Sequence, residues 1–191
     1  MAESKPRSAR DVPRTVTRRE LLVAESDEAF RHLVHGLLAF SERLMAVRQG
    51  FGQVVGLSGV EYTVLVSIAH LVERGQVSVN AIASHLHLSG AFVTIVTNQL
   101  VEKALIRKGR DAADRRRAML TVTPRGQQLL GRLAPLQQQV NDALFEPLTR
   151  DQFRALAALV DPLVDAADRA LALLGYLHAK SRCRGNVRGS R

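Results

Sequence analysis

Residues 103–117 concentrate the side chains whose chemistry is easiest to interpret, because they include seven basic and two acidic residues. Guanidinium and ammonium groups at this density suit an anionic partner, since both donate hydrogen bonds to phosphate oxygens. Two further basic segments lie at the chain ends: residues 1–20 carry +3 and residues 178–191 carry +5, while everything outside the three segments carries −4. Such clustering is typical of an electrostatic contact surface. The alternative is that the charged ends serve only solubility.

Other potentially reactive residues form weaker patterns. His32 and His35 lie three apart and His85 and His87 two apart, but no carboxylate or cysteine cluster accompanies them, so we expect no metal site. Cys183 is the single cysteine, which excludes an internal disulfide. The sequence has no phosphate-cradling glycine loop, no paired carboxylates and no Cys/His dyad, and we therefore expect neither an enzyme nor a cofactor.

Composition indicates a protein with a sizeable core and no membrane segment. Hydrophobic residues make up 46% of the 191 residues, yet the longest apolar stretch, residues 170–177, is far shorter than a membrane span of ~18 residues. The arginines near the N-terminus precede no apolar stretch, so they do not form a secretory signal. We expect a cytoplasmic protein.

Most of the elements that must position the basic residues at 103–117 have the periodicity of helices. Residues 1–24 contain two prolines and no sustained period, which predicts a flexible basic arm. A helix is expected from Ser26 as N-cap, with a loop where glycines recur from Gly50 to Gly56. Ser58 opens a capping box with Glu61, and the helix behind it ends near Gly75.

The following residues predict a helix-turn-helix and a hairpin. Ser78 and Ser89 can each cap a short amphipathic helix, and two short helices joined so closely form a helix-turn-helix. The period then changes to two, which predicts strands over 105–108 and 115–123 around a turn at 109–114. Thr123 and Thr149 can cap two final helices, whose apolar stripe reaches about Tyr176.

The block of residues 100–126 carries a resemblance to a known family. Leu-Val-Glu-Lys-Ala-Leu-Ile-Arg-Lys at 100–108 and Asp-Ala-Ala-Asp-Arg-Arg-Arg-Ala-Met-Leu-Thr-Val-Thr-Pro-Arg-Gly at 111–126 resemble the recognition-helix exit and wing of the MarR family of winged helix-turn-helix transcriptional regulators. Over about residues 26–175 the resemblance implies a mainly α fold with a two-stranded β wing, and an obligate homodimer built from the first helix and the last two that binds a pseudo-palindromic operator. The chain departs from the family pattern at Ala104, usually glycine, and at Ile95, often basic.

These expectations divide the chain into five parts. They are a flexible basic arm (1–24), an N-terminal dimerisation helix and loop (25–56), a winged helix-turn-helix DNA-binding domain (57–123), C-terminal dimerisation helices (124–177) and a basic tail (178–191).

The expected partner is double-stranded operator DNA. The Ser89 helix N-terminus suits a phosphate, and Asn98 suits an adenine edge. Phe92, Ala91 or Ile95 suits thymine methyl groups, unless Phe92 fills the domain core instead. Arg116 resembles the family arginine that enters the minor groove, held by Asp114. The full set of predicted DNA-binding residues is Ser78, Ser89, Gly90, Ala91, Phe92, Thr94, Ile95, Asn98, Arg110, Asp114, Arg115, Arg116 and Arg117.

The resemblance also implies a small effector that relieves repression. An aromatic or phenolic anion is expected, with an acyl-CoA thioester as the alternative, bound between the dimerisation helices and the winged domain. The side chains predicted to orient it are His35, Arg43, Phe51, Tyr62 and His70. A different class of protein, an architectural DNA-binding protein without sequence preference or effector, fits the same charge pattern.

Overall fold

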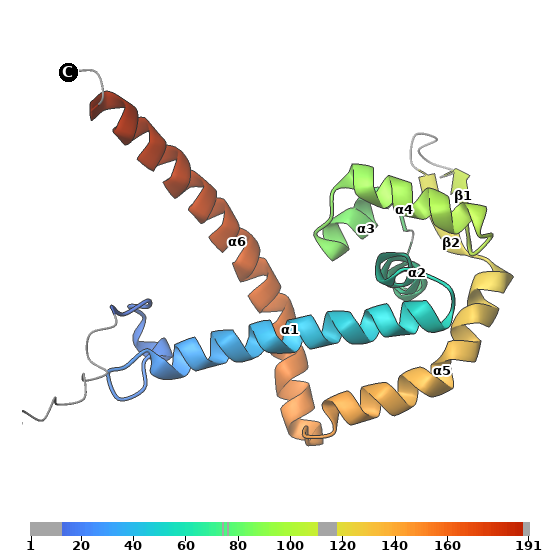
Figure 1. Ribbon diagram of the computed structural model, residues 1–191, viewed down its shortest axis with the longest axis horizontal. Helices are drawn as coiled ribbons and strands as arrows, with labels where there is room; N and C mark the ends of the chain where they lie inside the picture. Colours follow the sequence, from blue (N-terminus) through green and yellow to red (C-terminus); the bar gives the residue numbers. More distant parts are fainter. Residues whose placement is uncertain (1–12, 74, 76, 111–117, 189–191) are drawn as a thin grey trace, which may run out of the picture. The chain divides into compact units, whose positions relative to one another are not determined.

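The computed structural model describes residues 13–73, 75, 77–110 and 118–188 (Figure 1). Within these residues the chain is mainly α, with one two-stranded antiparallel sheet, which confirms the predicted fold class. The elements in chain order are a 3-10 helix (Arg19–Leu21), α1 (Glu28–Val54), α2 (Gly59–Val72), α3 (Val79–Leu86), α4 (Gly90–Glu102), β1 (Ile106–Arg110), β2 (Ala118–Val122), α5 (Pro124–Phe145) and α6 (Arg150–Arg188). The chain divides into two compact units at Pro135, inside α5.

The core of the first unit lies where α2, α3 and α4 meet the sheet. Its largest fully buried side chains come from every one of these elements, so the helix-turn-helix and the wing share one apolar interior. They are Tyr62, Val64, Leu65, Ile68, Val77, Ile82, Val93, Thr97, Leu100, Ile106 and Leu120, together with Leu133 of α5. The predicted inward face of α4, which is Val93, Val96, Thr97 and Leu100, is buried throughout.

Hydroxyl caps begin α2, α3, α4, α5 and α6 at the predicted positions. The Ser58 hydroxyl accepts from the Glu61 amide while the Glu61 carboxylate accepts from the Ser58 amide, which completes the capping box. Ser78 and Ser89 accept from the third amide of α3 and of α4. Thr123 caps α5, and the Thr149 hydroxyl and the Gln152 side chain exchange the same bonds before α6.

Three helices of the first unit end in the same way. A residue just beyond α1, α3 or α4 adopts a left-handed conformation, and the next amide donates to a carbonyl five residues earlier. Gly56 is left-handed without strain and ends α1, so Gly50 and Gly52 lie inside the helix rather than in the predicted loop. Ala104 ends α4 at φ +57°, which explains why a glycine would suit this position.

The start of α1 also differs from the prediction. Asp27, not Ser26, is the N-cap, and Ser26 accepts from the Glu28 amide. The buried Asp27 carboxylate accepts from the amide and hydroxyl of Thr15 at 2.7 and 2.8 Å and pairs with Arg31 at 2.5 Å. These hydrogen bonds and the Arg31 charge hold the pKa of Asp27 below its ordinary value, although burial opposes them. The described part of the predicted flexible arm is therefore anchored to α1.

The second unit contains the end of α5 and the long helix α6. Every α6 side chain from 150 to 182 is exposed within the unit, large apolar ones included. The helix continues to Arg188, so most of the predicted basic tail is helical. No single helix among the described residues is long and apolar enough to cross a membrane.

Candidate nucleic-acid interface

The outer face of α4 carries the predicted recognition side chains. The helix turns Val93, Val96, Thr97 and Leu100 into the core, so the side chains on its opposite side face outward. Phe92 is 41% and Ile95 56% exposed, and hence Phe92 does not fill the domain core. Ala91, Thr94 and Asn98 are exposed on the same helix. This face presents apolar and polar side chains to solvent, and packing in the core does not explain the apolar ones.

A contact that we did not anticipate joins this face to the wing. Lys108 of β1 donates from Nζ to the Asn98 amide oxygen at 2.5 Å. Lys108 pairs with the buried Leu120 in the strand register and follows the buried Ile106 by two residues. Because side chains alternate along a strand, Lys108 lies on the face of the wing that meets the helices. The alternation predicted for this strand already implies that Lys108 and Ile106 lie on the same face.

The predicted phosphate contacts of the helix starts lie at exposed or half-buried positions. Ser89 is exposed and caps α4, whose first amides precede Phe92. Ser78 is half-buried and forms an isolated bridge to Met119 of β2, so the start of α3 is fixed beside the wing. Amides at a helix start form a favourable site for an anion.

The sheet positions the base of the wing. Arg107 pairs with Thr121 in the register, and its Nε donates to the Thr121 hydroxyl at 2.9 Å on the face opposite Lys108. Arg110 is the last residue of β1 and pairs with Ala118. The predicted wing-tip residues Asp114, Arg115, Arg116 and Arg117 lie outside the described residues.

An ion pair connects α2 to the end of α4. Lys103 Nζ lies 2.6 Å from the Glu61 carboxylate, whose side chain is only 8% exposed. Burial would raise the pKa of Glu61, but the hydrogen bonds from Lys103 and Ser58 together outweigh it, and this pKa lies below its ordinary value. The Glu61 carboxylate therefore takes part in both the capping box and the ion pair, which fixes α4 against α2.

The predicted effector residues are not gathered in one place. Phe51 and Tyr62 are both buried and pack edge to face with ring centroids 5.8 Å apart. His35, Arg43 and His70 are exposed, and Arg43 donates to the Ala39 carbonyl of its own helix. The two aromatic side chains therefore belong to the core between α1 and α2.

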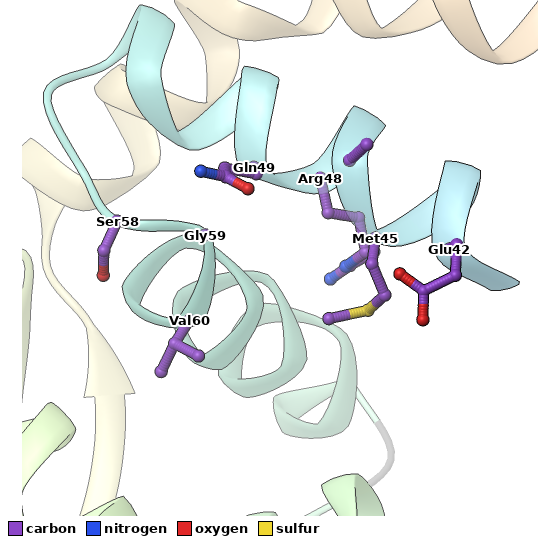
Figure 2. A pocket seen from close by; sticks show the side chains of 8 residues that line it. Glu42, Met45, Arg48, Gln49, Ser58, Gly59 and Val60 are labelled. Atoms are coloured by element: carbon purple, nitrogen blue, oxygen red, sulfur yellow. The ribbon is translucent and has the colours of Figure 1, made fainter.

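A cavity of about 400 Å³ lies between α1 and the start of α2, and none of the five predicted residues lines it (Figure 2). The cation among its lining residues is Arg48, which sequence reasoning missed. The guanidinium lies 5.4 Å from the Tyr62 ring centroid, and its Nε donates to Thr63. The other lining residues are Glu42, Met45, Ala46, Gln49, Ser58, Gly59 and Val60.

Histidine and carboxylate side chains do not gather into a metal site in the described part of the chain. His70 and His85 approach each other with ring centroids 6.5 Å apart, but no set of three possible ligands forms there.

Parts of this chain match known proteins in sequence and in fold. Residues 55–117 match the model of the MarR family. A search of curated proteins found no match. Among solved structures, BpsR from Bordetella bronchiseptica, described in a study of its regulation by 6-hydroxynicotinic acid, is 24% identical (TM-score 0.56; 69% of this chain and 91% of that chain).

Two further structures have the same fold at lower identity. The transcriptional regulator BldR from Sulfolobus solfataricus is 17% identical, with a TM-score of 0.59 over 70% of this chain and 95% of its own. A cysteine-to-serine mutant of MarR from E. coli, solved with operator DNA, is 17% identical with a TM-score of 0.57 over 71% of this chain and 94% of its own. Residues 55–117 therefore match the MarR family model, and the chain has the fold of these solved structures.

Proposed function

We propose that the protein is a ligand-responsive transcriptional regulator, most simply a repressor, that binds a pseudo-palindromic operator as a homodimer. The observation that carries the proposal is the exposed face of α4, with Phe92, Ile95 and Asn98 at the surface of a MarR-family domain. A helix with this exposure fits the major groove of DNA, where apolar groups meet thymine methyls and amides meet base edges.

The remaining DNA contacts follow from charge. Ser78, Ser89 and the basic residues of the wing are proposed to bind phosphates, which position the protein without specifying sequence. Arg116, held by Asp114, is proposed to enter the minor groove, where a narrow A·T tract concentrates negative potential.

Dimerisation is proposed from the apolar surface that each unit leaves exposed. In α1, Leu33 is 57% and Leu38 58% exposed, and in α6 Leu163 is 58% and Leu171 66% exposed. Such stripes on long helices need a partner, and a second copy of the chain supplies an identical one.

The cavity between α1 and α2 supports an aromatic or phenolic acid as effector. Arg48 offers a guanidinium for a carboxylate, Glu42 offers an acceptor for a phenolic hydroxyl, and Met45 and Val60 provide apolar contact. The relative regulated by 6-hydroxynicotinic acid responds to a ligand of this class. A volume of about 400 Å³ suits a single ring better than a whole acyl-CoA thioester.

Operator selection followed by binding titrations tests the proposal. A regulator should bind its selected sequence ~10³-fold or more above random DNA, and Arg116→Ala should weaken that binding by ~1–3 kcal/mol. Replacing Arg182, Arg184 and Arg188 together should weaken all sequences alike and flatten the salt dependence. Equal affinity for all sequences would favour the architectural DNA-binding protein instead. Either protein would act in the cytoplasm, beside the chromosome.

A thermal-shift screen of aromatic hydroxy acids and CoA esters, with and without operator, tests the effector. A true effector stabilises the free protein and releases DNA, since coupling between the two sites is reciprocal. Arg48→Met should abolish the shift, whereas Arg43→Met on the exposed side of the same helix should leave it unchanged. Hits that stabilise the protein but never release DNA would remove the effector from the proposal.

A further inference from the structure

The hydrogen bond between Lys108 and Asn98 determines which atoms the recognition face can offer to a base. An ammonium group only donates, so the atom facing Lys108 Nζ at 2.5 Å must be the amide oxygen of Asn98. The amide nitrogen, with its two donors, then takes the opposite position. Both side chains are exposed. Asn98 lies one helical turn beyond Ile95 on α4, and Lys108 reaches it from β1.

This pairing changes the base that Asn98 suits. An asparagine reads adenine by accepting from N6 and donating to N7, which requires its oxygen at the base edge. Here the oxygen faces a positive charge, and a positive charge beside the adenine N6 amino group is unfavourable. The pair instead presents two donors, the Asn98 amide nitrogen and the Lys108 ammonium. Guanine alone presents two acceptors, O6 and N7, at one major-groove edge.

We infer that Asn98 and Lys108 act together as a guanine-reading pair at one position of each operator half-site. The inference rests on the proposed function, because it assumes that α4 enters the major groove. It assigns to Lys108 a role in specificity beyond its charge. Phe92 and Ile95, nearer the start of the same helix, contact thymine methyls in neighbouring base pairs.

The test is operator selection from a random duplex library with the full-length wild-type protein, Lys108→Met and Arg107→Met. The two variants form a matched pair, since both remove one exposed cation from β1, on opposite faces of the strand. Wild type and Arg107→Met should both select a fixed guanine, and Lys108→Met should lose the preference at that position alone. Thermal melting of each variant confirms that it is folded.

A second measurement uses the selected operator with 7-deazaguanine at that position, which removes the N7 acceptor and keeps the base pair. The wild type should lose ~2–13-fold in affinity, the range for loss of one of the pair's two hydrogen bonds, and Lys108→Met, which no longer prefers guanine at that position, should show a smaller loss. Arg107→Met should weaken all sequences equally while keeping the wild-type loss on 7-deazaguanine.

Two other outcomes overturn the inference and are distinguishable. Selection of a fixed adenine that survives Lys108→Met would mean that Asn98 reads adenine and that Lys108 contributes charge only, with the proposed function intact. Selection of no sequence by the wild type would remove the proposed function, and the inference with it.

Discussion

Glu61 is a charged side chain that the fold nearly buries, and its environment gives the winged domain an acid-sensitive contact. Its carboxylate caps α2 through Ser58 and pairs with Lys103 at the end of α4. Removing one partner of such a pair leaves a poorly solvated charge, which costs more than the pair itself contributes.

We predict a loss of stability in acid that depends on this residue. Because the pKa of Glu61 is lowered in the folded state, its contribution is fully present above the ordinary value of 4.5 and is lost as pH falls below it toward the folded pKa. Glu61→Gln, which keeps an acceptor for the cap, should therefore flatten the decline in unfolding free energy below pH 4.5. Urea denaturation from about pH 7 to about pH 3 measures the difference, with exposed Glu42→Gln as the control. Identical acid profiles for wild type and Glu61→Gln would contradict it.

At the scale of elements, the junction between the wing and α5 is closely packed. The Thr123 hydroxyl donates to the Ala104 carbonyl at 2.7 Å and accepts from the Gly126 amide, while the Thr123 amide donates to the Leu105 carbonyl. A Cβ on Gly126 would overlap the Leu105 carbonyl oxygen and lie 2.7 Å from a Val122 methyl group. The exit of α4, the end of the wing and the start of α5 are thus packed backbone to backbone.

Two glycines of α5 should therefore respond oppositely to alanine. Gly126→Ala should destabilise the protein by ~1–3 kcal/mol, because the Leu105 backbone must move to admit the methyl group. Gly131→Ala, where nothing lies within 4 Å of the added carbon, should stabilise it by ~0.5–1 kcal/mol through helix propensity. Chemical denaturation of both variants measures whether each substitution lowers or raises the free energy of unfolding. Equal effects would mean that the close packing at Gly126 does not decide its identity.

Sequence patterns predicted the starts of helices well where a capping side chain sets them. They predicted helix boundaries less well where tertiary contacts set them. Ser58, Ser78, Ser89 and Thr123 cap helices as predicted, since capping depends on local hydrogen bonds. The prediction of a loop from Gly50 to Gly56 was wrong because packing holds residues 50–54 in α1, where the low helix propensity of glycine alone predicts a break.

The candidate site was predictable to the same degree. The outward face of α4 follows from helical spacing once its buried residues are known. The Asn98–Lys108 contact joins residues ten apart and the cavity at Arg48 joins two helices, so neither lies within one sequence period. The anchor of Thr15 on Asp27 joins residues 12 apart and was missed for the same reason.

At the scale of the whole molecule, the apolar stripes of α1 and α6 support the proposed dimer, because each stripe is exposed within its own unit. We expect a mass near twice 21.0 kDa by light scattering at micromolar concentration. Leu163→Glu should shift the protein toward monomer, because it places a charge in the stripe of α6. Arg169→Glu changes the charge of the same helix without removing an apolar side chain and serves as the control. A wild-type mass of 21.0 kDa would refute dimerisation.

The shared ending of α1, α3 and α4 has a consequence for how such proteins diverge over evolutionary time. Each ending is made by backbone groups, with a left-handed residue as its one conformational requirement. His87 and Ala104 show that even this requirement tolerates residues other than glycine, at a cost of ~1–2 kcal/mol each. Mutational drift can therefore alter the surface side chains of α4 while the corners that aim the helix persist. Substitutions on that surface can therefore accumulate without loss of the backbone geometry that positions α4.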